Sequence, residues 1–232
     1  MKKDDFVIIT KKLNKIYGSQ DTIVHALQNI NISIIRGDYI SIIGPSGSGK
    51  STFMNMVGCL DQPTSGKLFI DNVDISKLND NQLAKIRREK IGFIFQKYNL
   101  LPTLNAVENV ALSMSFAGIG FYERINRSRE LLDMVGLSHR LNHKPSELSG
   151  GEQQRVAIAR AISNKPSIIL ADEPTGNVDS KSGSKILDIL EDINKQGNTV
   201  IIVTHDHSVA KRAKWIIRIN DGVVSAYADR QH

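Results

Sequence analysis

The sequence predicts an α/β fold with a mainly parallel sheet, antiparallel strands at the N-terminal end and an inserted helical segment. Short apolar runs typical of buried parallel strands alternate with helical patterns along most of the chain. Between residues 97 and 163 only helical patterns occur. At 232 residues, and about 150 residues per domain, we expect a single domain. Residues 1–96 and 164–232 would form its core and 97–163 a helical subdomain.

The first elements are predicted strands. Phe6–Tyr17 and Ile23–Ile35 alternate between apolar and polar side chains, most clearly from His25 to Ile32, as in antiparallel strands with one solvated face. Tyr39–Ile43 is apolar without that alternation, which predicts a buried parallel strand. It leads into a glycine-rich loop, after which a helix is expected from Lys50 to about Val57.

The remaining elements continue this alternation. Strands are expected at Lys67–Asp71 and Ile91–Phe95, with the helix Asn81–Lys90 between them and Asp80 as its candidate N-cap. Within the inserted segment the predicted helices are Ala106–Phe116, Arg124–Val135 and Gly151–Ile162. The elements that follow are the strand Ser167–Ala171, the helix Ser180–Asn194, the strands Thr199–Val203 and Trp215–Ile219, the turn Asn220–Gly222 and a last short strand.

The composition is that of an ordinary globular protein. Hydrophobic residues make up 41% and charged residues 23%, which argues against collagen-like, low-complexity and disordered classes. The net charge of +6 is a mild excess that identifies no partner. The single cysteine, Cys59, lies in an apolar stretch and is expected to be a buried, reduced thiol. No stretch has the roughly 18 apolar residues of a membrane span or the pattern of a signal peptide, so we expect neither.

The glycine-rich loop fits the phosphate-binding pattern G-x-x-x-x-G-K-[ST]. Glycines let consecutive backbone N–H groups point inward toward phosphate oxygens, and the following helix adds the positive end of its dipole. Lys50 would neutralise the outer phosphates, and the Ser51 hydroxyl would bind Mg²⁺. The residues expected at the nucleotide are Gly44, Pro45, Ser46, Gly47, Ser48, Gly49, Lys50, Ser51 and Thr52.

Two further segments carry candidate chemistry. The strand at residues 167–171 is followed by Asp172 and Glu173, whose side chains should diverge, so that Asp172 can bind the metal and Glu173 can face the attacking water. The alternative is that both carboxylates cap the turn at Pro174. In Leu148–Arg155 a polar glycine turn opens a helix, which makes a second anion site. The alternative there is an ordinary helix start with Ser149 as N-cap.

With these motifs in order, the sequence resembles the ABC-type ATPases, the nucleotide-binding subunits of ATP-binding-cassette transporters. Leu148–Arg155 corresponds to their signature motif, with Ser149, Gly150, Gly151 and Glu152 as implied nucleotide ligands. Tyr17 matches the aromatic residue that stacks on adenine, Gln96 the Q-loop glutamine, Asp179 the D-loop and His205 the switch histidine. Taken alone, Tyr17 could be a core residue, Gln96 a helix cap and His205 a satisfied strand-end histidine.

The resemblance covers nearly the whole chain and implies a P-loop NTPase (RecA-like) core. It also implies that two copies sandwich two ATP molecules head to tail, each lending its signature to the other's nucleotide. In the implied hydrolysis Glu173 polarises water, His205 contacts the γ-phosphate and Lys50 neutralises charge. The implied Mg²⁺ ligands are Ser51, Asp172 and Gln96. Val178 stands where the family more often has leucine, a small apolar exchange.

The resemblance also implies a membrane partner. Residues 58–66 and 143–148 are most similar to the lipoprotein-releasing and macrolide- or peptide-exporting subfamily, whose permease subunits bear large extracytoplasmic domains. We expect the chain at the cytoplasmic face of the cell membrane, with Leu100–Leu104, Phe116 and Phe121 near the docking site or in the subdomain core. An alternative is a soluble ABC ATPase acting on nucleic acid or ribosomes, but no heptad run or basic aromatic tail occurs, and no nucleic acid is expected. A small-molecule kinase would leave Leu148–Arg155 unexplained.

Overall fold

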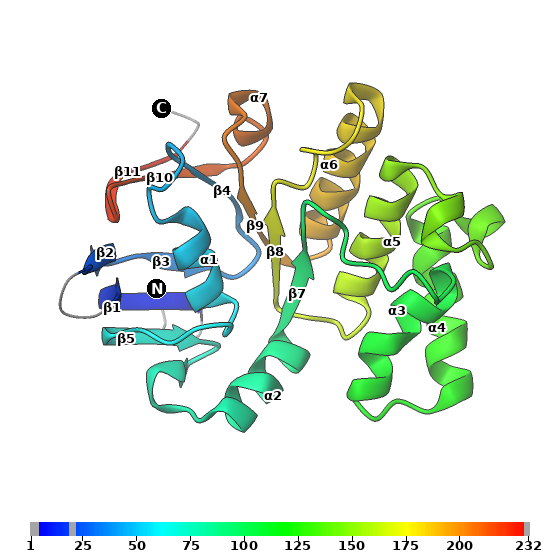
Figure 1. Cartoon of the computed structure of the whole chain (residues 1–232), viewed down its shortest axis with the longest axis horizontal. Helices are drawn as coiled ribbons and strands as arrows, with labels where there is room; N and C mark the ends of the chain where they lie inside the picture. Colours follow the sequence, from blue (N-terminus) through cyan, green and yellow to red (C-terminus); the bar gives the residue numbers. More distant parts are fainter. Residues whose placement is uncertain (1–4, 19–21, 230–232) are drawn as a thin grey trace.

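The computed structural model describes residues 5–18 and 22–229 and contains the predicted mainly parallel sheet. The strand order of this six-stranded sheet is β11-β10-β4-β9-β8-β7, and every pairing from β10 to β7 is parallel. Its strands are β4 (Tyr39–Ile43), β7 (Ile91–Ile94), β8 (Ile168–Asp172), β9 (Thr199–Val203), β10 (Trp215–Asn220) and the antiparallel β11 (Val223–Asp229). The α/β prediction is therefore confirmed (Figure 1).

A second, antiparallel sheet forms the N-terminal part, as predicted. It has the order β2-β1-β5-β6, with β3 paired to β1. The strand expected at 23–35 is split, because Ile32 N donates to Thr10 Oγ1 and the chain changes its pairing from one half of β1 to the other. The strands are β1 (Phe6–Tyr17), β2 (Val24–Ile30), β3 (Ser33–Ile35), β5 (Ser65–Ile70) and β6 (Val73–Asp74).

The helices follow the predicted pattern with local differences. They are α1 (Lys50–Val57), α2 (Asp80–Lys90), α3 (Ala106–Phe116), α4 (Phe121–Met134), α5 (Gly150–Ile162), α6 (Ser180–Lys195) and α7 (His207–Ala210), with 3-10 turns at Ile75–Lys77, Ser138–Arg140 and Pro145–Glu147. The prediction of Asp80 as N-cap is wrong: Asn79 caps α2 through a capping box with Gln82. Helix α4 begins at Phe121 rather than Arg124, and its first turn carries the exposed aromatic residues Phe121 and Tyr122.

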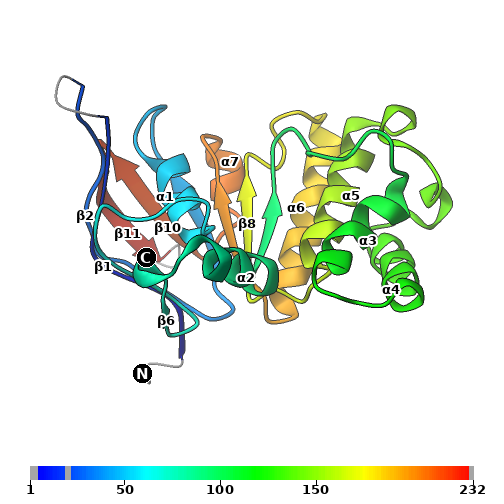
Figure 2. The same cartoon turned by 60° about the horizontal axis from the view of Figure 1, so that its bottom comes forward.

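The parallel strands are buried on both faces, so alternate residues enter different cores. Leu170 and Ile201 pack with residues of α1 and the antiparallel sheet. Ile169 and Ile202 pack with residues of α5 and α6. Figure 2 shows β1 and β2 at one end of the molecule and α3, α4 and α5 at the other.

The carboxyl ends of β4, β7, β8 and β9 meet at one edge of the sheet, since these strands are parallel and adjacent in the order given above. The predicted phosphate loop, Gln96, the paired carboxylates and His205 follow these strands directly. Ligands of open α/β sheets bind at such an edge. Among the described residues, no helix is both long enough and apolar enough to cross a membrane.

Candidate functional site

The glycine-rich loop between β4 and α1 folds around the ammonium of Lys50. Lys50 Nζ donates hydrogen bonds to the carbonyl oxygens of Gly44 at 2.9 Å and Pro45 at 2.8 Å. Gly47 and Gly49 adopt φ angles of 75° and 104°, which side chains with a Cβ rarely reach. Gly49 is the N-cap of α1 and brings no capping side chain, so the first N–H groups of the helix stay available to an anion.

A cavity of about 480 Å³ opens beside this loop. The backbone of the loop is held from outside the motif, because Gly222 N donates to Ser48 O at 2.9 Å. A Cβ on Gly49 would lie 2.5 Å from Ala26 O, so only glycine fits against β2. The cavity is lined by Tyr17, Val24, His25, Ala26, Gln28, Gly47, Ser48, Gly49, Lys50, Ser51, Thr52, Asp221 and Gly222.

Tyr17 lies at this cavity and is not a core residue. Its side chain is at the end of β1, and the residue is 39% exposed. His25, Gln28 and the Asp221–Gly222 turn also line the cavity, although the sequence analysis did not assign them to the site. The turn was predicted as a turn, but no sequence pattern placed it against the phosphate loop.

Asp172 is the last residue of β8, and Glu173 follows it directly. Burial, followed by the charge of Glu173, raises the pKa of Asp172, while the nearby Lys50 ammonium opposes this rise. Lys50 of the phosphate loop is therefore near enough for its charge to act on the Asp172 carboxylate. The Glu173 carboxylate turns toward β9 and the residues after it, rather than toward the turn at Pro174. Each oxygen of Glu173 is bound there, so Glu173 does not fit the alternative of a turn cap.

Glu173 is held by the segment that follows β9. Its Oε1 lies 2.6 Å from His205 Nδ1 and 2.9 Å from His205 N, and its Oε2 accepts a hydrogen bond from Thr204 Oγ1 at 3.0 Å. Glu173 has a φ of 45°, a left-handed conformation that is costly for a residue with a Cβ. Thr204 is buried and was missed by the sequence analysis, because only its position after a parallel strand hints at the contact.

Gln96 lies against the turn that follows Glu173. Asn177 Nδ2 donates to Gln96 O at 2.9 Å, and a Cβ on Gly176 would lie 2.7 Å from Gln96 Nε2. Tyr98 OH donates to Asn177 O at 2.9 Å. Gln96 is thus held against the turn after Glu173, and it is not a helix cap. The segment after β7 and the turn after β8 therefore contact each other.

The second predicted anion site is a capped helix start in this chain. The Ser149 hydroxyl accepts from Glu152 N, and Glu152 Oε2 accepts from Ser149 N at 2.8 Å, which forms a capping box. Cβ atoms on Gly150 and Gly151 would lie 2.7 Å from Tyr98 OH and from Ser182 Cβ. The helix start therefore needs glycines for its packing on neighbouring segments.

The structure does not bring this helix start to the phosphate loop. Among the described residues, none of Ser149–Glu152 lines the cavity at Lys50. Asp179 also lies elsewhere: its side chain accepts hydrogen bonds from Lys181 N and Ser182 N as the N-cap of α6. It lines a separate cavity of about 460 Å³ next to α7. Within one chain, Ser149–Glu152 and Asp179 lie outside the cavity at Lys50 and, unlike Gln96, Asp172, Glu173 and His205, do not stand at the carboxyl end of a parallel strand.

The donor set at the sheet edge fits Mg²⁺. The Ser51 hydroxyl, the Asp172 carboxylate and the Gln96 amide all offer oxygen, which this hard cation prefers. In the described part of the chain, no group of three or more His, Cys, Asp or Glu residues could hold a metal ion. A site with one carboxylate suits Mg²⁺, which is usually bound by one or two carboxylates together with substrate phosphates and water.

Comparisons with known proteins agree with this geometry. The family model described as ABC transporter matches residues 27–176. The chain is 52% identical to the uncharacterized ABC transporter ATP-binding protein MJ0796 of Methanocaldococcus jannaschii over 94% of this chain and 95% of that protein. It is 51% identical to the macrolide export ATP-binding/permease protein MacB of Mannheimia succiniciproducens, over 94% of this chain but 34% of MacB. A solved dimer of the MJ0796 cassette, bound to ADP and Pi, superposes with a TM-score of 0.89 at 48% identity, covering 97% of this chain and 99% of that one.

Proposed function

Since the chain belongs to the ABC transporter family, we propose that two copies of it bind two ATP molecules between them and couple hydrolysis to a separate membrane subunit. The observation that carries this proposal is the division of the predicted ligands. The phosphate loop and the Ser149 helix start, where the capping box leaves the N–H groups of Gly150 and Gly151 unused, are both suited to phosphate, yet they do not share a cavity in one chain. A second copy, placed head to tail, supplies the missing half of each site.

The phosphate loop would hold the triphosphate through its backbone N–H groups, with Lys50 beside the outer phosphates. Lys50 is already oriented by the carbonyl oxygens of Gly44 and Pro45, so little reorganisation is needed. Ser51, Asp172 and Gln96 would hold Mg²⁺, which supplies charge neutralisation at the phosphates when bound. A cation beside Asp172 would favour the charged carboxylate, whose pKa is raised by burial and by Glu173.

Glu173 is the proposed residue that polarises the attacking water for in-line displacement at the γ-phosphate. Its carboxylate is now bound by His205 and Thr204, which fixes its position at the edge of the sheet. His205 could contact the γ-phosphate through Nε2 while Nδ1 stays on Glu173 Oε1, or through Nδ1 after leaving Glu173. We propose that nucleotide binding exchanges this contact, so that Glu173 is freed for water when His205 is bound to phosphate.

The substitution Glu173→Gln tests this assignment. It keeps the size of the side chain but removes its charge, so steady-state ATP hydrolysis should fall by about 10²–10⁴-fold, the usual contribution of a general base. ATP binding should remain, and light scattering on a sizing column should detect a dimer that forms only with ATP. Lys50→Ala is the control: it should bind ATP weakly and stay monomeric at the same nucleotide concentration. Hydrolysis by Glu173→Gln at the native rate would show that another group acts on the water.

The membrane subunit has a candidate docking site beside Gln96. A cavity of about 610 Å³ lies between α2 and β7 on one side and α3 and α5 on the other. Its lining is mostly apolar and includes Phe95, the residue that precedes Gln96 in the chain. Its lining residues are Ala84, Arg87, Arg88, Ile91, Gly92, Phe93, Phe95, Asn99, Ser113, Phe116, Arg160, Ala161 and Asn164.

We propose that a short cytoplasmic helix of an integral membrane subunit occupies this cavity. Phe116 lines it and is 68% exposed, whereas Leu101 and Phe121 are exposed outside the lining. Of the segments expected to dock, Phe116 thus has the strongest support. Leu100 instead packs partly against the helical core.

The chain spans about a third of MacB, so the permease role of that relative comes to this protein only as a proposal. The proposed partner has a large extracytoplasmic domain and works in export or lipoprotein release, with the ATPase at the cytoplasmic membrane face.

The docking proposal is tested with Phe116→Asp. Because the side chain is exposed, the variant should fold and hydrolyse ATP, but it should no longer co-purify with a membrane subunit that retains the native chain. The matched control is Tyr122→Asp, an aromatic residue of the same region that is 84% exposed and outside the cavity. Equal retention of both variants by the membrane subunit would exclude this docking site.

A further inference from the structure

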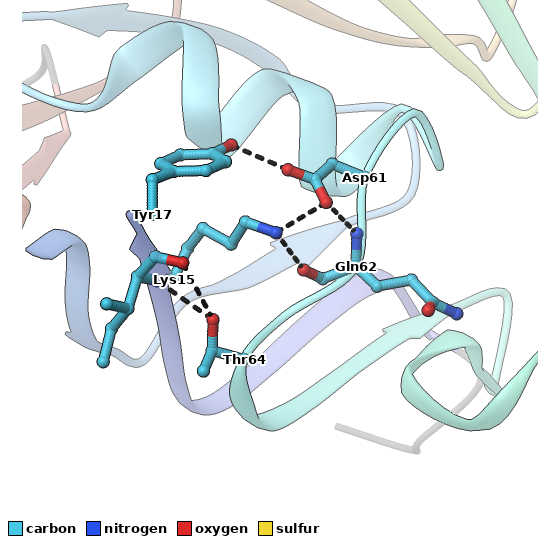
Figure 3. Close-up of polar contacts among 6 residues, drawn as sticks. Lys15, Tyr17, Asp61, Gln62 and Thr64 are labelled. Atoms are coloured by element: carbon cyan, nitrogen blue, oxygen red, sulfur yellow. Dashed lines mark hydrogen bonds and ion pairs between the residues drawn. The ribbon is translucent and has the colours of Figure 1, made fainter. Parts of the chain in front are cut away.

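The phenol of Tyr17 is tethered to a carboxylate that no sequence motif assigned to the site. Tyr17 OH donates to Asp61 Oδ2 at 2.7 Å, and the other oxygen, Oδ1, accepts from Lys15 Nζ at 2.6 Å and from Gln62 N at 2.7 Å (Figure 3). Asp61 therefore bridges two side chains of β1. The orientation of the Tyr17 side chain is therefore restrained at both ends, by the backbone of β1 and by the hydrogen bond of its hydroxyl group.

Lys15 holds the same ring from a second direction. Its Nζ lies over the Tyr17 ring, 4.7 Å from the centroid, and also donates to Gln62 O at 2.9 Å. Lys15 and Tyr17 are two residues apart on one strand, so their side chains leave on the same face. The lysine covers one face of the ring, and a planar ligand in the cavity must use the other.

The segment that carries Asp61 is fixed relative to the phosphate loop. It follows α1 directly, and α1 begins at Lys50. Ile16 N donates to Thr64 Oγ1 at 3.0 Å, which ties the same segment to β1 once more. The Tyr17 ring is therefore positioned through Asp61 and α1 against the loop that would hold the phosphates.

We propose that Asp61 and Lys15 are positioning residues that hold the Tyr17 ring in the orientation in which a purine base stacks on it. The inference rests on the proposed function, since it requires a nucleotide whose phosphates lie at Lys50. An exposed tyrosine without a tether samples several orientations, and binding would have to order it. The tether removes this cost before the base arrives and so increases affinity for the base without touching it.

The ionisation of the phenol agrees with this role. Burial, then the hydrogen bond to Asp61 and the charge of Asp61, raise the pKa of Tyr17 to about 12, against a smaller lowering by Thr52. The phenol thus stays protonated at neutral pH and remains a donor to Asp61. For Asp61, burial is outweighed by the hydrogen bonds from Lys15 and Tyr17, which lower its pKa, so it stays a charged acceptor.

The experiment compares Kd values for ATP and for inorganic tripolyphosphate by calorimetry. Tyr17→Phe keeps a ring that stacks equally well but cannot bond to Asp61. We expect it to raise the Kd for ATP by about two- to tenfold, the fold-change that corresponds to the entropic cost of ordering one side chain. Asp61→Ala should have the same effect, and the double variant should be no weaker than either single one. Tripolyphosphate has no base, so its Kd should be unchanged in all three.

Two controls keep the effect specific. Tyr122→Phe alters an exposed tyrosine away from the cavity, and Asp192→Ala removes a carboxylate that pairs with Lys195 on the surface. Neither should change the Kd for ATP. Native affinity for ATP in Tyr17→Phe, or additive losses in the double variant, would overturn the tether. Failure of the native chain to bind either compound would overturn the proposed nucleotide site itself, which is a different result.

Discussion

Glu173 is the residue at which structure and proposed chemistry are most closely joined. Its φ of 45° is unfavourable for a residue with a side chain, and the surrounding contacts must stabilise it. Those contacts come from Thr204 and His205, one buried and one exposed. A buried hydroxyl can hold the carboxylate in place while the exposed imidazole moves. These two contacts suit Glu173, because Thr204 can keep its carboxylate in position after His205 has moved away.

Thr204→Val tests the positioning role of the buried hydroxyl. The substitution keeps the shape of the side chain but removes the donor to Glu173 Oε2 and the acceptor for Asp206 N at 3.0 Å. We expect a loss of about 1–3 kcal/mol in the free energy of unfolding and a lower kcat, measured by urea denaturation and steady-state kinetics. Thr199→Val, at the other end of β9, removes the acceptor for Gly37 N. It should lose stability but keep kcat, and an equal kcat loss in both would contradict the role of Thr204.

Cys59 should behave as an inert, buried thiol. Burial raises its pKa to about 12, opposed by the nearby Arg87, and the residue is the only cysteine in the sequence. At pH 8 only about one thiol in ten thousand would be ionised. A thiol-reactive disulfide should therefore label the native chain at the rate of its unfolding, and faster with added urea. Rapid labelling of the native chain at pH 8 would show that the thiol is accessible.

At the scale of elements, the sequence predicts types better than boundaries. The strands Tyr39–Ile43 and Thr199–Val203 have the predicted limits, because continuous apolar runs bounded by glycine or polar residues have one way to be buried. The interruption of 23–35 depends on which half of β1 each part pairs with, which no local pattern specifies. The N-cap of α2 was misplaced by one residue because Asn79 and Asp80 are both good caps.

Asn109 organises the segment that leads into α3. It is buried, accepts from Leu101 N at 2.8 Å, and donates to the carbonyl oxygens of Leu101, Leu104 and Asn105 at 3.0–3.2 Å. One side chain thus replaces a set of backbone hydrogen bonds that this loop cannot make with itself.

Asn109→Ala should destabilise the chain by about 2–3 kcal/mol, since several buried backbone groups lose their partner. Hydrogen exchange should accelerate from 101 to 105, next to the proposed docking cavity. Asn79→Ala is the control: loss of the cap of α2 should cost about 1 kcal/mol without faster exchange in that segment. Unchanged exchange in Asn109→Ala would mean that other contacts hold the loop.

At the scale of the molecule, much of the candidate site could be predicted from the sequence. Its residues directly follow predicted parallel strands, and those of the phosphate loop have the spacing of a known motif. The phosphate loop, Asp172, Glu173, Gln96 and His205 all lie at the carboxyl ends of parallel strands, at one edge of the sheet. Lys15, Asp61 and Thr204 could not be predicted, since their contacts join residues 46 and 31 positions apart without a motif. The position of Ser149 relative to the nucleotide depends on a second copy, which a single chain does not specify.

Composite sites made by two copies are the central claim, and mixing two inactive variants tests it most directly. Lys50→Ala damages the phosphate loop, and Ser149→Arg removes the helix cap and places bulk where the partner's γ-phosphate would lie. Each variant alone should have little ATPase activity, with folding checked by thermal denaturation. In a mixed dimer one site combines the intact phosphate loop of one copy with the intact Ser149 of the other. ATPase activity should therefore rise on mixing, in proportion to the amount of mixed dimer. Mixtures as inactive as the separate variants, with mixed dimers demonstrably formed, would contradict the central claim.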